Sequence, residues 1–193
     1  TDPVAEGSSY DILVIGGGYT GATFAVQFVR TCSVPVEIRI IEPREEVGRG
    51  LAYSATDPDH RLNGALESHM IDLTRPDELR RWCVADGVLK RDPDGRGPAG
   101  HVFLRRSDFG AFMSATVRSE ADGSRTGSTI AHVRDTATAI ERHDGLYLVH
   151  TRQHGPLSAD LVVVATGNPT PALRPPFTAT AHLHPAIVAN PLL

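Results

Sequence analysis

Six residues near the start of the chain have the types and spacing of a phosphate-binding loop. Residues 16–21 read Gly-Gly-Gly-Tyr-Thr-Gly and match the pattern G-x-G-x-x-G. Gly16 permits a tight turn, Gly18 lets the backbone approach a pyrophosphate, and Gly21 lets the following helix pack close to a strand. The N–H groups and the dipole at the start of that helix attract phosphate charge. The motif therefore predicts the binding of a dinucleotide.

An acidic residue follows the loop at the distance found in dinucleotide sites. Glu42 ends an apolar segment, 21 residues after Gly21. Its carboxylate can accept hydrogen bonds from ribose hydroxyl groups and would repel a 2′-phosphate, which disfavours NADP in this site. The alternative is a plain glycine-rich turn beside a surface glutamate. The strand before the loop and the helix after it favour the binding site.

The elements around this loop form a βαβ unit. Residues 10–15 are an apolar run that stops at the glycines, as a buried parallel strand does. Residues 19–31 have small and apolar residues at helical spacing, and residues 36–41 read as a second strand. Such a unit holds the loop at the carboxyl end of its first strand.

The rest of the chain contains two more helices and a run of strands. The composition of the middle predicts an irregular loop over 43–70, a helix over 76–85 and a surface loop over 92–100. A further helix is expected over 107–119. Strands are then predicted by alternating patterning over residues 129–134, 136–142, 145–151 and 158–165.

These consecutive strands distinguish between two classes of dinucleotide-binding domain. A NAD-dependent dehydrogenase would continue with alternating helices and strands, which this chain does not do. An antiparallel β-meander followed by a strand that ends Val164-Ala165-Thr166-Gly167 resembles the FAD-binding domain of the glutathione-reductase-like flavoproteins. The resemblance implies that the late strand returns beside the first one and closes on the cofactor.

Further stretches narrow the resemblance. Residues 42–54 and 60–63 are similar to the bacterial FAD–NAD(P)-binding family, as is the stretch 103–110, in which Arg105 replaces the usual proline. The resemblance covers residues 10–191, and the family is akin to flavin-dependent N-hydroxylating monooxygenases. It implies an α/β fold: a Rossmann-like, three-layer FAD-binding domain with a parallel sheet and an antiparallel β-meander.

The same resemblance implies the residues that bind the cofactor. They are Gly16, Gly18, Tyr19, Thr20, Gly21, Glu42, Arg44, Arg49, Gly50, Leu51, Asn63, Val133, Ala165, Thr166 and Gly167. The glycine-rich loop would hold the pyrophosphate, Glu42 the adenosine ribose, and the two arginines would lie near the phosphates or the adenine.

The remaining implied positions surround the two rings of FAD. Gly50, Leu51 and Asn63 would line the path to the flavin ring. The backbone of Val133, on the first strand of the meander, would meet the adenine edge, and residues 165–167 would close over the dinucleotide. The alternative for Arg44, Arg49 and Arg106 is a solvated surface arginine, and for Asn63 a turn-forming side chain.

Composition excludes several other classes of function. A net charge of −4 and a pI of about 6.1 leave no large cationic field for nucleic acid, and no apolar run is long enough for a transmembrane helix. We therefore expect a cytoplasmic protein, with Cys32 and Cys83 as free thiols. Metal-ligand, nucleophile-elbow and P-loop motifs are absent from the sequence, and Lys90 is its only lysine. We predict no metal ligand and assign no catalytic side chain, because in flavoproteins the cofactor carries the chemistry.

Three segments are expected along the chain: a disordered N-terminal segment over 1–9, the FAD-binding domain over 10–170, and a Pro-rich linker over 171–193. In the resembling family this linker leads to a second dinucleotide-binding domain, for the nicotinamide cofactor, which these residues lack. We expect the FAD-binding part of an FAD-dependent, NAD(P)H-linked oxidoreductase, with monooxygenation as a candidate reaction and a missing domain or partner subunit completing it. The alternatives are a noncatalytic FAD- or NAD-binding module that acts with a partner, and a NAD-dependent dehydrogenase.

Overall fold

Four parallel strands form the central sheet of the domain. The structure, a computed structural model, describes residues 10–168. The order of the strands in the sheet is β3-β2-β1-β7. The strands are β1 (Tyr10–Ile15), β2 (Val36–Ile41), β3 (Thr129–Val133) and β7 (Leu161–Val164). All their carboxyl ends therefore meet at one edge, where α/β sheets bind ligands.

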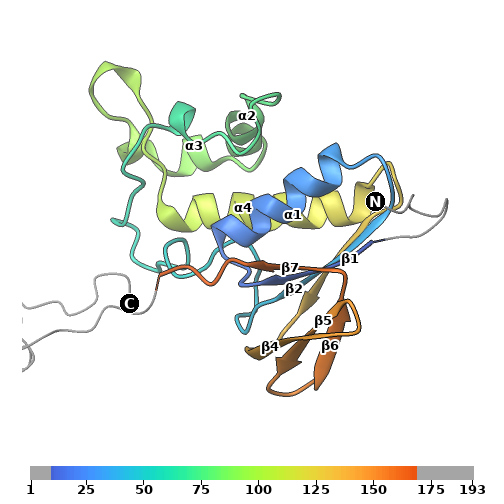
Figure 1. The fold of residues 1–193 in the computed structure, drawn as a ribbon. Coiled ribbons are helices and arrows are strands. Elements are labelled where there is room, and N and C mark those ends of the chain that lie inside the picture. Colours follow the sequence, from blue (N-terminus) through green and yellow to red (C-terminus); the bar gives the residue numbers. More distant parts are fainter. Residues whose placement is uncertain (1–9, 169–193) are drawn as a thin grey trace, which may run out of the picture.

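Helices cover one face of this sheet (Figure 1). Helix α1 (Tyr19–Thr31) follows β1 and buries a stripe of small and apolar side chains against it. Helix α4 (Arg106–Gly123) packs beside α1 and buries Phe109, Phe112 and Met113. The apolar spacing along both helices matches the helical repeat, so one continuous core forms between the helices and the sheet.

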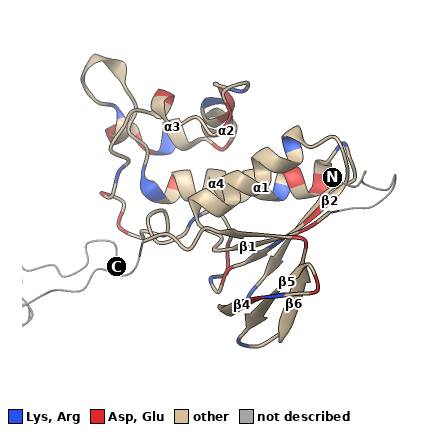
Figure 2. Cartoon of the chain, viewed as in Figure 1, with Lys and Arg blue, Asp and Glu red and all other residues tan. Residues whose placement is uncertain are grey.

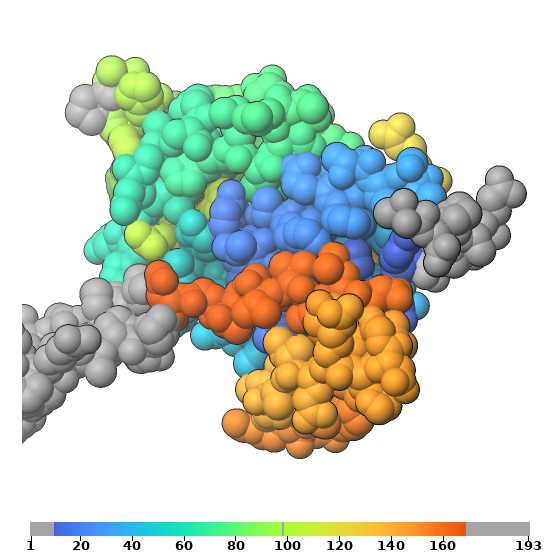
Figure 3. Space-filling model, in the orientation of Figure 1, coloured from blue at the N-terminus to red at the C-terminus, as the bar shows by residue number. Residues whose placement is uncertain are grey.

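An insertion between β2 and α4 holds the remaining helices. It contains α2 (Glu78–Ala85), α3 (Val88–Arg91) and short 3₁₀ turns at Leu66–Ser68, Pro93–Gly95 and Pro98–Gly100. Figure 3 shows the insertion, in cyan to green, on the opposite side of the molecule from the orange meander. The helix expected over 76–85 is confirmed as α2, whereas α3 and the 3₁₀ turns were not predicted, because segments of one turn leave no periodic pattern.

A three-stranded antiparallel meander covers the other face of the sheet. It consists of β4 (Ala137–His143), β5 (Leu146–Thr151) and β6 (Pro156–Ala159). Val149 and Ala159 pack against Leu13, Ile15 and Ile41 of the sheet. The expected three-layer α/β architecture is thus confirmed: helices, a parallel sheet and a β-meander.

Two strand predictions were wrong in detail. The first strand of the expected meander is β3, which pairs in parallel with β2, so Val133 lies in the central sheet and not in the meander. The strand expected over 158–165 is two strands, β6 and β7, separated by Asp160. The main-chain N–H of Asp160 donates to the carbonyl of Asp11, and the Asp160 carboxylate accepts the N–H of Asp11. Period-2 patterning marks a strand but does not reveal its partner.

Buried ion pairs fasten the insertion to the helices. Arg30 of α1 is almost fully buried and pairs with Asp72, Glu78 and Glu120, three carboxylates from three segments. Figure 2 shows positions of both charge signs interleaved over the α2–α3 region. Because an unpaired buried charge is costly, this cluster holds the insertion in one orientation.

A buried aspartate joins the meander to the sheet. The carboxylate of Asp135, just after β3, accepts the main-chain N–H groups of Thr136, Gln153 and His154 at 2.7–2.9 Å. His154 Nδ1 lies 2.8 Å from Asp135 Oδ2. Burial alone would raise the pKa of Asp135, but these hydrogen bonds outweigh it and the pKa lies well below its usual range.

This aspartate predicts a pH dependence of stability. A carboxyl whose pKa is lowered by folding contributes stability above its unfolded pKa, about 3.9, and loses it as the pH falls through the folded value. We expect Asp135→Asn to lower the free energy of unfolding at pH 7, measured by urea denaturation, and the difference from wild type to shrink below about pH 4. Asp144→Asn, at an exposed turn, should show neither effect. An Asp135→Asn deficit that stays constant with pH would refute the argument.

One glycine lets α4 approach the segment after β2. A Cβ atom on Gly110 would lie 2.4 Å from the carbonyl oxygen of Tyr53 and 3.1 Å from Arg49 Cγ. The backbone segment that includes residues 49–53 therefore rests directly on the helix. This contact explains the glycine at the end of the stretch 103–110.

Two glycines of α4 supply a matched test. We expect Gly110→Ala to destabilise the domain by about 1–3 kcal/mol, because the new methyl group meets backbone that cannot move aside cheaply. Gly123→Ala, in the same helix with no heavy atom within 4 Å, should be neutral or stabilise by up to about 1 kcal/mol. Urea unfolding of both variants measures the difference. Equal effects would show that the contact with residues 49–53 is not restrictive.

Candidate functional site

A cavity of about 480 Å³ opens at the carboxyl ends of the parallel strands. It lies where the loops after β1, β2 and β7 meet. Most of the expected cofactor-binding residues line it: Gly16, Gly18, Tyr19, Thr20, Glu42, Arg44, Arg49, Gly50, Leu51, Ala165, Thr166 and Gly167. Its size is in the range of small-molecule sites.

Close backbone contacts assemble the wall of this cavity. Gly16 has a φ of 101°, and a Cβ there would lie 2.4 Å from the carbonyl oxygen of Ala165. The N–H of Gly48 donates to the carbonyl of Gly17 at 2.7 Å. Three separate segments therefore meet around one glycine-rich loop, and side chains at its first position would push them apart.

The start of α1 presents unused hydrogen-bond donors to the cavity. Gly18 is the N-cap of α1, and no side chain in the described part of the protein caps this helix. The first N–H groups of a helix have no partner inside it, so those of Tyr19 and Thr20 require an outside acceptor. Together with the helix dipole, they form a site for an anion.

Glu42 is buried and organises the loops around the cavity. Its side chain is 3% exposed, and its Oε2 accepts the N–H of Gly17 at 3.0 Å. Its Oε1 accepts both the N–H and the guanidinium of Arg44, at 3.0 and 3.1 Å. His132 Nε2 lies 2.8 Å from the carbonyl oxygen of Glu42. Each carboxylate oxygen has two lone pairs, so Oε2 still has one to accept a ribose hydroxyl.

Two guanidinium groups lie at the edge of the cavity. Arg44 is held by Glu42, while Arg49 donates through Nη1 to the carbonyl of Ser107 at 3.3 Å and pairs through Nε with Glu46. Both arginines line the cavity, with the Arg44 side chain 46% exposed and that of Arg49 24% exposed. They give it positive charge suited to phosphates.

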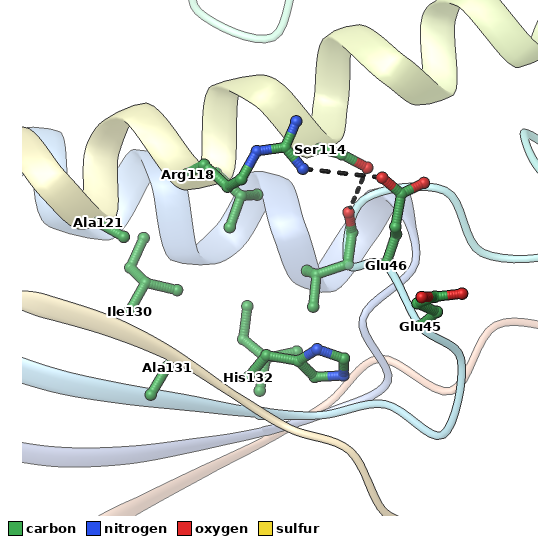
Figure 4. A pocket seen from close by; sticks show the side chains of 11 residues that line it. Glu45, Glu46, Ser114, Arg118, Ala121, Ile130, Ala131 and His132 are labelled. Carbon is green, nitrogen blue, oxygen red and sulfur yellow. Dashed lines mark hydrogen bonds and ion pairs between the residues drawn. The ribbon is translucent and has the colours of Figure 1, made fainter.

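A second cavity, of about 190 Å³, lies on the helical side of the sheet between α4 and β3. Figure 4 shows its lining, in which Glu46 pairs with Arg118. Ser114 Oγ donates to the carbonyl of Val47. Glu46 pairs with Arg118 at this cavity and with Arg49 at the main cavity, so one carboxylate links the linings of the two cavities.

Three expected residues do not line the main cavity. Gly21 is buried below it, where a Cβ would lie 2.0 Å from the carbonyl oxygen of Gly16, which fits its role in helix packing. Asn63 is exposed and its Oδ1 accepts a hydrogen bond from Arg106 Nη2 at 3.2 Å. The carbonyl of Val133 accepts the N–H groups of Glu42 and Asp135.

Other residues line the cavity without having been predicted. They are Ala52, Tyr53 and Asn168. Ala52 and Tyr53 directly follow the predicted Gly50 and Leu51, and Asn168 directly follows the A-T-G segment, so proximity in sequence was the available signal. The structure adds the fact that Tyr53 also contacts Tyr19.

The structure shows little that suggests other chemistry. Cys32 and Cys83 are free thiols, and burial raises the pKa of Cys83 to about 11, which keeps its thiol protonated and unreactive. Within residues 10–168, no three His, Cys, Asp or Glu side chains are grouped so as to hold a metal ion. None of the helices described is both long and apolar enough to cross a bilayer. The expected cytoplasmic location stays a prediction.

Fold and site together define the class of protein. A parallel sheet, a G-x-G-x-x-G loop opening α1, a buried acid after β2 and a meander on the far face are the features of a dinucleotide-binding domain of the Rossmann type. Residues 13–169 match the sequence model of the FAD-NAD(P)-binding family, and the chain belongs to that family. The family expected from the motifs is thereby confirmed.

Solved structures with the same fold include several flavin enzymes. A flavin-containing monooxygenase from Stenotrophomonas maltophilia has a TM-score of 0.54 and 16% identity, with 87% of this chain and 41% of that one covered. An ornithine N-hydroxylase from Kutzneria, with reduced FAD, NADP⁺ and L-ornithine, has a TM-score of 0.55 and 13% identity, with 83% and 38% covered. A cyclohexanone monooxygenase has a TM-score of 0.54 and 17% identity, with 87% of this chain and 29% of that one covered.

These likenesses show the shared fold. The chain spans about two fifths or less of the length of these monooxygenases. A comparison with curated protein sequences finds no match.

The buried carboxylate of Glu42 supplies a test of the site without a ligand. In Glu42→Gln, an amide NH₂ group replaces one carboxylate oxygen that accepts N–H groups in the wild type. Two hydrogen-bond donors then face each other. We expect a loss of about 1–3 kcal/mol in the free energy of unfolding, measured by urea denaturation. Glu45→Gln, at an exposed neighbouring position, should leave stability unchanged. A stable Glu42→Gln variant would mean that the carboxylate does not hold the two loops.

Proposed function

We propose that this chain binds FAD in the main cavity and forms the FAD-binding part of an NAD(P)H-linked flavin oxidoreductase of the monooxygenase type. One observation carries the proposal: the uncapped start of α1, the buried Glu42 and the A-T-G segment after β7 all line the same cavity. Membership of the FAD-NAD(P)-binding family supports the cofactor. The fold shared with flavin monooxygenases supports a reaction of the monooxygenase type.

The groups that line the cavity fit the parts of FAD. The N–H groups of Tyr19 and Thr20 would bind the pyrophosphate, with Arg44 and Arg49 adding positive charge. Glu42 would accept a hydrogen bond from the adenosine ribose while it keeps its contact with Gly17. The bound flavin would supply the hydride and oxygen chemistry, and this chain would position it.

The remaining residues close the site. The backbone of Ala165–Gly167 would lie over the dinucleotide, because Ala165 is held beside β1 by its N–H bond to the carbonyl of Ile15 at 2.8 Å. Gly50 and Leu51 would face the cofactor from the opposite loop. A nicotinamide cofactor and the substrate would bind with the help of a further domain or a partner subunit.

The two alternatives differ in what they predict. The meander between β3 and β7 argues against a NAD-dependent dehydrogenase, which would have a helix and strand there. A noncatalytic module would bind FAD in the same cavity and would not pass electrons from NAD(P)H.

Gly18 gives a sharp test of cofactor binding. A Cβ on Gly18 would lie 3.5 Å from the nearest atom, Gly50 Cα, and its φ is −71°, so Gly18→Ala should fold with wild-type stability. The methyl group would nevertheless stand where the pyrophosphate approaches the backbone. We expect FAD affinity to fall at least about tenfold, measured by titration of the absorption bands near 375 and 450 nm.

Controls separate the possible outcomes. Gly123→Ala, remote from the cavity on α4, should bind FAD like wild type. If wild type takes up NAD but no FAD, the FAD assignment is wrong. If FAD binds and NAD(P)H does not bleach it under anaerobic conditions, the chain alone is a binding module.

A further inference from the structure

The main cavity has one aromatic wall that the pyrophosphate and ribose contacts do not use. Tyr53 and Tyr19 both line the cavity, with ring centroids 6.0 Å apart and planes at 73°. Tyr53 comes from the segment after β2 and Tyr19 from the first turn of α1.

The core holds the Tyr53 ring in place from behind. Its centroid lies 4.7 Å from that of Phe109, in an edge-to-face arrangement, and Tyr19 contacts the same phenylalanine at 5.9 Å. The N–H of Tyr53 donates to the carbonyl of Arg49, and its carbonyl lies close to Gly110. Ring and backbone are therefore both fixed, so the wall is formed before any ligand arrives.

The charged groups of the cavity are engaged by other protein groups, Arg49 by Glu46 and by the carbonyl of Ser107. Glu42 and Arg44 are bonded to each other and supply the ionic groups next to Gly17, whereas Gly50, Leu51, Ala52 and Tyr53 supply no charge. Burial, followed by the neighbouring Tyr19, raises the pKa of the Tyr53 phenol, so the group is neutral at physiological pH. A neutral aromatic surface suits a planar, apolar ring system rather than a sugar or a phosphate.

We infer that Tyr53 contacts the isoalloxazine ring of FAD and, with Tyr19, forms the wall against which that ring is positioned. This inference rests on the proposed function, since it requires FAD in the cavity. What it adds is Tyr53, beside Gly50 and Leu51, which were already expected to line the path to the flavin ring.

Flavin fluorescence tests the contact without any assay of activity. A phenol in contact with an excited flavin donates one electron to it and recovers that electron in the dark, so emission is quenched with no net reaction. Phenylalanine does not donate in this way. Tyr53→Phe keeps the packing on Phe109 and removes only the hydroxyl group, so the fold should be preserved.

We expect FAD bound to the wild-type chain to be strongly quenched, and FAD bound to Tyr53→Phe to emit several-fold more light with a longer excited-state lifetime. Tyr147→Phe, whose ring lies in the meander beside Arg142, is the matched control and should match wild type. Tyr19→Phe should give an increase smaller than that of Tyr53→Phe. Absorbance of the protein after gel filtration reports the bound FAD in every sample.

The outcomes are distinct. Equal emission from Tyr53→Phe and wild type, at equal bound FAD, overturns the inference and leaves FAD binding intact, as it would if the adenine lay on this wall. An increase in Tyr19→Phe alone assigns the contact to Tyr19 and also overturns it. If no sample retains FAD, the proposed function and this inference fall together.

Discussion

The structure depends on how closely backbone segments approach one another at the loop 16–18. Gly16 touches Ala165, Gly17 lies against Glu42, and Gly18 faces Gly50, so three segments distant in sequence meet over a few ångströms. A Cβ on Gly17 would lie 2.7 Å from the Cβ of Glu42. Because no side chain can fill this space, the ends of β1, β2 and β7 come together and leave a cavity beside the loop. The same absence of side chains that permits the fold exposes the N–H groups that a phosphate needs.

Charge is distributed around this loop so that the site is stable without a ligand and still has capacity to bind one. The Glu42 carboxylate satisfies Gly17 and Arg44, which offsets the cost of burying it. Glu46 similarly restrains Arg49 and reaches Arg118 on the other side of its loop. The donors left over are the first N–H groups of α1, which no side chain caps in the described part of the chain. A helix that gave those donors a side-chain acceptor would be more stable alone and would lose its anion site.

The sequence predicted the elements whose signals are local. The β1–α1–β2 unit followed from an apolar run, a glycine motif and helical spacing. Strand pairing depends on contacts distant in sequence. The alternating pattern of β3 resembles that of the meander strands, yet β3 pairs with β2, so Val133 lies in the central sheet. In the site, most residues near the motifs line one cavity, whereas Asn63 lies outside it. Tyr53 was missed because its place depends on Phe109 and Gly110, more than 50 residues away in sequence.

The link between Tyr53 and α4 explains why the insertion belongs to the site although it contributes few residues to it. Phe109 contacts Tyr19 and Tyr53 on one side and Phe112 on the other, and Phe112 contacts Trp82 of α2. Gly110 sets the separation between this helix and the loop that carries Arg49 and Tyr53. An insertion that repacked α2 would therefore shift α4, and through it the aromatic wall, without touching the phosphate-binding loop. The two halves of the cavity consequently have different supports: main-chain contacts between strand ends hold the phosphate-binding half, and side-chain packing on α4 holds the aromatic half. Variation in the insertion can then alter what lies against the wall while the anchoring of the dinucleotide stays the same.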